Sequence, residues 1–152
     1  MKELEYPFDP SLILSKRKKL RRELLDDGQP RIKKKIAVLG GSTTSDIVKT
    51  LDLFLLNEGI EAELFESEYN RWWQDAVFGT AELDEFAPDV IIGTGGYACW
   101  PIMAAAARMG IPTALHESNA HPGLAIRRLQ SKVDRIWVNF PETAVAFGNS
   151  PK

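Results

Sequence analysis

The sequence has little of the residue types that bind metals or form disulfides, with one cysteine and two histidines among 152 residues. A lone cysteine excludes an internal disulfide framework, so we expect a cytoplasmic protein. Two histidines give little basis for a zinc site, and we expect no metal and no cofactor. The longest largely apolar stretches, such as residues 102–109, are far shorter than the roughly 20 residues that a membrane helix needs. We therefore expect no membrane span.

Charge is unevenly distributed along the chain, although the formal net charge is only −2. Residues 1–35 carry 11 of the 19 Lys and Arg but only 6 of the 21 Asp and Glu. The basic run at 16–22 contains no aromatic residue that could stack on a base, so we interpret it as a solvated helix face and expect no nucleic-acid partner. With 44% hydrophobic residues, the chain can bury the core of one domain, 1–152, of undetermined oligomeric state.

Hydrophobic periodicity predicts alternating strands and helices. Asp9 followed by Pro10 is typical of a helix start and Gly28 of a stop, which predicts an opening helix over residues 10–27. Short apolar runs predict five strands, and helical patterns lie between them. The predicted strands are 36–39, 62–65, 90–92, 113–115 and 136–138, and the helices between and after them begin near 43–45, 71, 101, 123 and 141.

This alternation predicts an α/β fold. Strands joined through helices pair in parallel by right-handed crossovers, which places helices on both faces of the sheet. We expect a doubly wound, five-stranded parallel sheet of the flavodoxin-like or Rossmann-like kind, in the order 2-1-3-4-5, with an extra N-terminal helix. In that order, ligands usually bind at the carboxyl ends of the first and third strands.

The first candidate loop, residues 40–46, joins a predicted strand to a helix. Free N–H groups at the start of a helix favour an anion or a developing oxyanion. Ser42 is therefore a candidate nucleophile or phosphate ligand, with Gly41 and Thr43 beside it, although serine and threonine at such positions are also ordinary helix caps. The loop lacks the residues of a Walker loop and of a dinucleotide fingerprint.

Two further loops follow the third and fourth strands. Gly95, Gly96 and Tyr97 stand where a backbone can approach a ligand closely, or where glycine merely makes a tight turn. The segment His116-Glu117-Ser118-Asn119 places an imidazole, a carboxylate and an amide at a strand end, which is where α/β enzymes hold working residues and where a histidine can also be structural.

The two halves of the chain resemble two different families. Residues 1–92 carry Pro7-Phe8-Asp9-Pro10, a strand ending at residues 40–45 in Gly-Gly-Ser-Thr-Thr-Ser, and Phe65-Glu66-Ser67-Glu68-Tyr69-Asn70. They resemble the amino-terminal domain of FkbH-like proteins, an SGNH-hydrolase-like group. That resemblance implies a nucleophile at Ser42, yet the chain has no Asp-x-x-His to supply its base.

Residues 93–152 carry Gly-Thr-Gly-Gly-Tyr at 93–97, His-Glu-Ser-Asn-Ala at 116–120 and Phe-Pro-Glu-Thr at 140–143. They are similar to the acceptor-side domain of MurG glycosyltransferases, which use UDP-N-acetylglucosamine. Ser118 departs from the glutamine of that family's His-Glu-Gln-Asn motif. The resemblance implies a phosphate or sugar-phosphate ligand.

Because each set of motifs is incomplete, we expect an engineered chimeric scaffold without catalytic turnover. One alternative is a residual SGNH-like serine hydrolase, with Ser42 as nucleophile, His116 as base and Glu117 orienting that base. Another is a sugar-phosphate-binding remnant of the glycosyltransferase. Its ligand-binding residues would be Gly41, Thr43, Gly95, Gly96, Tyr97 and Asn119.

Overall fold

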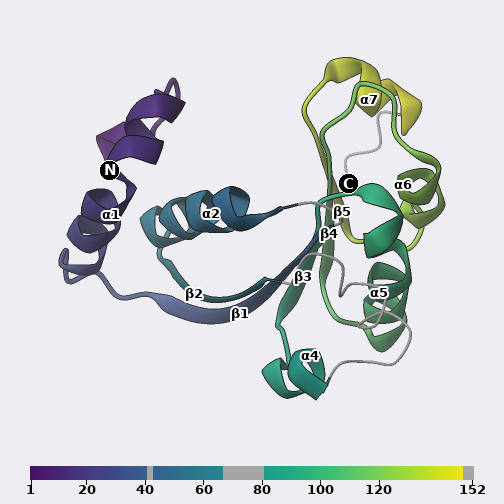
Figure 1. Ribbon diagram of the computed structural model, residues 1–152, viewed down its shortest axis with the longest axis horizontal. Coiled ribbons are helices and arrows are strands. Elements are labelled where there is room, and N and C mark those ends of the chain that lie inside the picture. The colour runs from purple at the N-terminus through teal and green to yellow at the C-terminus, as the bar shows by residue number, and fades with distance from the viewer. Residues whose placement is uncertain (41–42, 67–80, 149–152) are drawn as a thin grey trace.

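The computed structural model describes residues 1–40, 43–66 and 81–148. Its sheet has five parallel strands in the order β2-β1-β3-β4-β5, which confirms the predicted fold (Figure 1). The strands are β1 (Ile32–Leu39), β2 (Ile60–Glu66), β3 (Val90–Gly93), β4 (Thr113–Glu117) and β5 (Arg135–Val138).

Helices cover both faces of the sheet, as expected. One face packs against α2, and the other packs mainly against α5 and α6 (Figure 1). The helical elements are η1 (Lys2–Leu4), α1 (Pro10–Leu25), α2 (Ser45–Asn57), α4 (Ala81–Phe86), α5 (Gly96–Met109), α6 (Leu124–Leu129) and α7 (Pro141–Ala146).

The alternation of side chains along β1 explains how one strand serves two cores. Val38 packs in a cluster with residues of α2, whereas Ala37 and Leu39 join a larger cluster on the opposite face with α5 and α6. Successive side chains of a strand point to opposite faces, so a continuous apolar run is buried on both sides. This burial is what makes the run at 36–39 a central strand.

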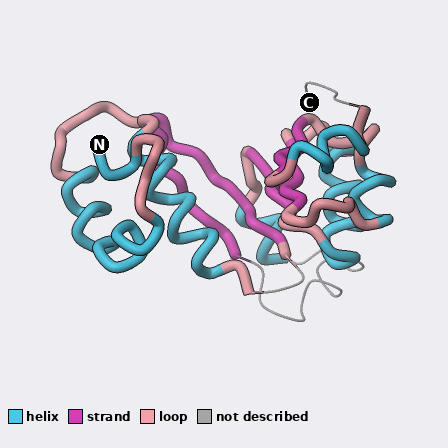
Figure 2. The backbone as a smooth tube through the Cα atoms, turned by 90° about the horizontal axis from the view of Figure 1, so that it is seen from above, coloured by secondary structure: helices cyan, strands magenta, loops and turns pink. Residues whose placement is uncertain are grey.

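The opening helix α1 lies outside α2, on the side away from the strands (Figures 1 and 2). The Asp9 carboxylate caps it, since Oδ1 accepts hydrogen bonds from the backbone nitrogens of Ser11 at 2.8 Å and Leu12 at 3.2 Å. Ile13, Leu20 and Leu24 are its buried residues. They form a separate cluster with Leu4, Leu53 and Leu56.

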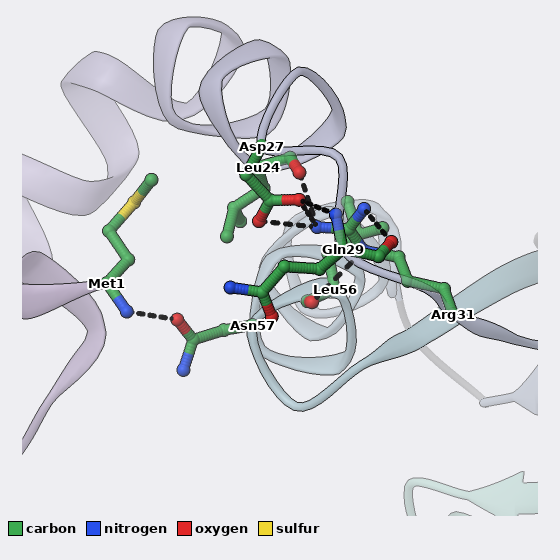
Figure 3. A network of polar contacts seen from close by, with 7 residues as sticks. All are labelled: Met1, Leu24, Asp27, Gln29, Arg31, Leu56 and Asn57. Atoms are coloured by element: carbon green, nitrogen blue, oxygen red, sulfur yellow. Dashed lines mark hydrogen bonds and ion pairs between the residues drawn. The ribbon is translucent and has the colours of Figure 1, made fainter.

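Polar contacts hold α1 and α2 together. Arg31 follows α1 and donates hydrogen bonds to the Asp27 carboxylate and to the backbone oxygens of Leu24 and Leu56 (Figure 3). Arg21 Nε lies 2.6 Å from Asp52 Oδ2. Arg31 therefore bridges the carboxyl ends of two helices, where a cation is favourable.

Two elements, β1 and α5, begin four or more residues before their predicted starts, whereas most other boundaries differ by one or two residues. β1 begins at Ile32 and pairs with β2 through three consecutive lysines that gave no apolar signal. Helix α5 begins at Gly96, five residues before Pro101, which lies inside the helix. Proline is most common in the first turn of a helix, which is why the sequence predicts a start at Pro101, whereas here it lies in the second turn and lacks the N–H for one helical hydrogen bond. The predicted helix at 71–86 is described only for 81–86.

Candidate functional site

The carboxyl ends of β1, β3 and β4 meet at one edge of the sheet. In the parallel register, Leu39 pairs with Gly93, and Gly93 pairs with Leu115. Thr94 N donates to Leu39 O at 2.9 Å, which ties the loop after β3 to the end of β1. The three loops in which we predicted ligand-binding residues therefore follow neighbouring strands.

The loop after β3 is made of glycines with left-handed backbone angles. Gly95 has a φ of 93° and Gly96 has a φ of 79°. Gly95 is the N-cap of α5 and has no side chain to satisfy the first N–H groups of the helix. A Cβ added at Gly95 would lie 3.7 Å from His116 O, so the loops after β3 and β4 are in close proximity. The Tyr97 side chain lies outside the described residues.

At the loop after β1, Gly41 and Ser42 lie outside the described residues. Thr43 is exposed. Thr44 occupies the N-cap position of α2 but makes no side-chain cap; its hydroxyl donates instead to Glu66 Oε1 at 2.7 Å. The Thr44 side chain therefore joins the start of α2 to the end of β2 and leaves N–H groups of α2 uncapped by that hydroxyl.

His116 contacts the neighbouring strand end. Its Nε2 lies 3.0 Å from Oδ1 of Asn139, which directly follows β5. The exposed oxygen of an amide is an acceptor, so this geometry fits an imidazole that carries its proton on Nε2. In that tautomer the other ring nitrogen, Nδ1, is the acceptor.

Glu117 does not orient His116, which corrects the role expected for it in the hydrolase alternative. Glu117 is 3% exposed, and its Oε1 accepts hydrogen bonds from Asn119 N at 2.9 Å and Asn119 Nδ2 at 2.7 Å. Its Oε2 accepts from Gly123 N at 3.2 Å. Adjacent residues of a strand point to opposite faces, so the two side chains diverge. The carboxylate instead shapes residues 117–123.

Thr143 of α7 supports the same segment and was missed in the sequence. Its side chain is fully buried, and its hydroxyl lies 2.8 Å from Asn119 O and 3.0 Å from Ala120 O. The Phe-Pro-Glu-Thr motif contains this threonine, but the contact spans more than 20 residues and gives no local pattern. Asn119 is thus held on both sides, by Glu117 and by Thr143.

Cys99 packs beneath this site as a neutral thiol. It is 1% exposed, and burial raises its pKa to about 11. Because the thiol ionises first in the unfolded chain, its contribution to stability is complete below its ordinary pKa of 9.0 and is lost as the pH rises towards 11. We expect stability to fall on the order of 2 kcal/mol over that window through this group.

The free energy of unfolding should fall less between pH 8.5 and 10.5 in Cys99→Ala than in the wild type, by on the order of 2 kcal/mol, because the variant has no thiol to ionise. Urea unfolding of both proteins at each pH measures the difference. Identical pH dependence in the two proteins would show that the native thiol is not buried as described.

The described residues lack both a metal cluster and a membrane-spanning helix. They contain no group of three or more His, Cys, Asp or Glu side chains arranged to hold a metal ion. Among the same residues, no helix is long and apolar enough to cross a membrane.

The fold and the glycine turns together define a Rossmann-like domain with uncapped helix starts at its carboxyl edge. Residues 55–138 match the family model described as the glycosyltransferase family 28 N-terminal domain, and the chain belongs to that family. The match begins within α2 and runs to the end of β5, so it includes the loops after β3 and β4.

Curated relatives carry one name, UDP-N-acetylglucosamine–N-acetylmuramyl-(pentapeptide) pyrophosphoryl-undecaprenol N-acetylglucosamine transferase. The protein of Desulforamulus reducens is 42% identical over 95 residues, which cover 60% of this chain and 25% of the relative. That of Lactococcus lactis subsp. lactis is 35% identical over 112 residues, 69% of this chain and 31% of the relative. The chain thus spans about a quarter to a third of these relatives.

Solved structures with a similar fold have low sequence identity. MurG of Acinetobacter baumannii aligns with a TM-score of 0.56 at 18% identity, covering 72% of this chain and 42% of that structure. The N-terminal part of the protein BF1531 from Bacteroides fragilis, which contains a phosphatase domain complexed with Mg, aligns with a TM-score of 0.56 at 15% identity, covering 86% of this chain and 46% of that structure. These likenesses show the fold alone.

The comparisons correct the expected function. An engineered chimera without turnover is wrong, because one family match spans residues 55–138 and crosses the supposed junction at 92 without a break. The expectation that the chain is not an enzyme is wrong for the same reason, since the family and the named relatives are glycosyltransferases. The MurG-like part of the resemblance is supported, whereas a separate SGNH-like half is not.

Proposed function

We propose that this chain is the acceptor-binding part of a UDP-N-acetylglucosamine-dependent glycosyltransferase and binds a glycosyl diphosphate at the carboxyl edge of its sheet. The observation that carries the proposal is the family 28 match across β3, β4 and β5, which contains both loops at that edge. The names of the relatives describe an acceptor in which a sugar is joined to a lipid through a pyrophosphate.

The diphosphate belongs at the helix starts. The left-handed turn at Gly95 and Gly96 leaves the first N–H groups of α5 facing the edge, where the helix dipole favours negative charge. α2 starts at the same edge, because it follows the neighbouring strand β1. The other residues assigned to this ligand are Gly41, Ser42, Thr43, Tyr97 and Asn119.

His116 is assigned the role of base. In the transfer, an acceptor hydroxyl attacks the anomeric carbon of the UDP sugar, the bond from that carbon to the diphosphate breaks, and the hydroxyl proton needs an acceptor. With Nε2 donating to Asn139, the His116 Nδ1 atom is free to take that proton. Glu117 acts indirectly, by holding Asn119 in place. Ser42 serves as a phosphate ligand, since this reaction needs no enzyme nucleophile.

Binding of N-acetylmuramyl diphosphate, the head group in the relatives' names, tests the proposal by calorimetry. We expect saturable binding, and we expect the same sugar without phosphate to bind far more weakly because it lacks the charge that the helix starts attract. Absence of binding by both the glycosyl diphosphate and inorganic pyrophosphate would contradict the function.

The base is tested by transfer from UDP-N-acetylglucosamine after the chain is combined with the remaining part of a curated relative. His116→Ala should lower the rate at saturating acceptor by roughly 100-fold or more, which is the usual effect of losing a general base. His121→Ala is the matched control, because it removes the chain's other histidine, which is exposed. Equal rates for both variants would refute the role of His116.

A further inference from the structure

The outward side of β5 carries exposed polar and aromatic residues. Ile136 and Val138 pack against the larger core cluster, so the alternating residues Arg135, Trp137 and Asn139 project from the opposite face. All three are exposed, and Trp137 is 47% exposed. Helices α5 and α6 pack in the core cluster with Ile136 and Val138, on the face of β5 opposite to these residues.

Sheet register brings the candidate base to the same face. His116 is the partner of Trp137 in the parallel pairing of β4 with β5. Paired residues on neighbouring strands lie about 4.8 Å apart and point to the same side. His116 also contacts Asn139. One imidazole, one indole and one amide therefore share a small area at the carboxyl end of two strands.

We propose that Trp137, His116 and Asn139 form a subsite for the sugar ring of the glycosyl diphosphate. This inference rests on the proposed function and assigns the part of the ligand that the phosphate-binding loops leave unplaced. The face of the Trp137 indole stacks on the C–H face of the pyranose, while the two planar polar side chains hydrogen-bond to its oxygens and N-acetyl group.

The chemistry of this surface favours a sugar over a hydrocarbon chain. An apolar chain would cover the polar atoms that the contact between His116 and Asn139 does not use, the amide nitrogen of Asn139 and Nδ1 of His116, and burying them without partners is costly. A pyranose has one face of C–H groups for the indole and a rim of hydroxyls for the polar side chains. Arg135, on the same face, adds a cation that an acidic substituent of the sugar can approach.

The position of this subsite fits a ligand that also reaches the glycine turn. The His116 backbone oxygen lies close to Gly95, where an added Cβ would be 3.7 Å from it. A diphosphate at the start of α5 and a sugar on β4 and β5 are thus adjacent groups of one molecule. Trp137 was not among the residues that the sequence indicated, although the alternation of residues 135, 137 and 139 along the predicted strand was the available signal.

Calorimetry with two ligands separates this inference from the proposed function. Trp137→Ala should weaken N-acetylmuramyl diphosphate binding by roughly three- to tenfold, the contribution of an aromatic stacking contact, and should leave binding of inorganic pyrophosphate unchanged. Trp137→Phe should recover most of the loss because it keeps a ring. If the wild-type chain binds neither ligand, the proposed function fails and this subsite fails with it.

The control is Trp100→Ala, which removes a tryptophan that is 37% exposed on α5, away from β5. It should leave sugar binding as in the wild type, and the urea midpoints of all variants should show that they fold. Unchanged binding by Trp137→Ala would overturn the subsite. So would a concentration-dependent dimer, seen by light scattering, that Trp137→Ala abolishes without affecting sugar binding, because that result assigns the face to a second copy of the chain.

Discussion

Gly93→Ala is expected to destabilise the domain by about 1–3 kcal/mol, although it adds a single methyl group. Gly93 ends β3 beneath α5, and an added Cβ would lie 2.9 Å from Leu115 Cδ2 and 3.1 Å from the sulfur of Met103. Both neighbours are fully buried, so neither can move into solvent. Urea unfolding followed by circular dichroism measures the change in the free energy of unfolding.

A double-mutant cycle identifies the cause. Leu115→Val removes the terminal methyl groups that the new Cβ would meet, so it should cost less in the Gly93→Ala background than in the wild type. Gly123→Ala is the control for adding a methyl group to a glycine, because no atom lies within 4 Å of its added Cβ and the residue has an ordinary φ of −66°. Strict additivity of Gly93→Ala and Leu115→Val would refute the steric explanation.

Glu117→Ala should destabilise the protein by about 2–4 kcal/mol, because it removes a buried carboxylate and leaves the backbone N–H groups of Asn119 and Gly123 without their acceptor. Glu117→Gln should be destabilising as well, since both carboxylate oxygens accept hydrogen bonds and an amide presents a donor to one of these N–H groups. Urea unfolding gives the magnitude, and amide hydrogen exchange at residues 119 and 123 should accelerate in both variants.

The neighbouring Ser118 provides the control for this segment. Its side chain is exposed, so Ser118→Ala should change stability by less than about 0.5 kcal/mol. Binding of N-acetylmuramyl diphosphate should weaken with Glu117→Ala and persist with Ser118→Ala, because only the former releases Asn119. Native-like exchange at residue 119 in Glu117→Ala would show that Thr143 alone holds the segment.

The fold was predictable because each central strand is a short apolar run that ends in glycine or a polar residue. Such runs fix parallel pairing, and five of them suit only a few strand orders. The amino-terminal half of β1 was not predictable, since Lys33, Lys34 and Lys35 are strand residues only through their pairing with β2. Pro101 misplaced the start of α5 because a local rule about prolines cannot recognise the turn made by two glycines with positive φ.

The candidate site was predictable as a location but not as a set of contacts. Gly95 and His116 follow the ends of two predicted parallel strands, so the sequence alone predicts that they lie at one edge of the sheet. The partners of these loops are distant in sequence, for example Asn139 for His116 and Thr143 for the backbone of Asn119. The predicted function was wrong because short motifs on each side of residue 92 resemble two different families, whereas one family match covers residues 55–138.

The outer position of α1 has a consequence for how this domain can change over time. Its buried leucines belong to the cluster formed with α2 and η1, whereas the sheet packs through two other clusters. Substitutions that repack α1 and the outer side of α2 together therefore leave the strand ends where they are. The surface of the amino-terminal layer can therefore change during evolution independently of the ligand-binding loops.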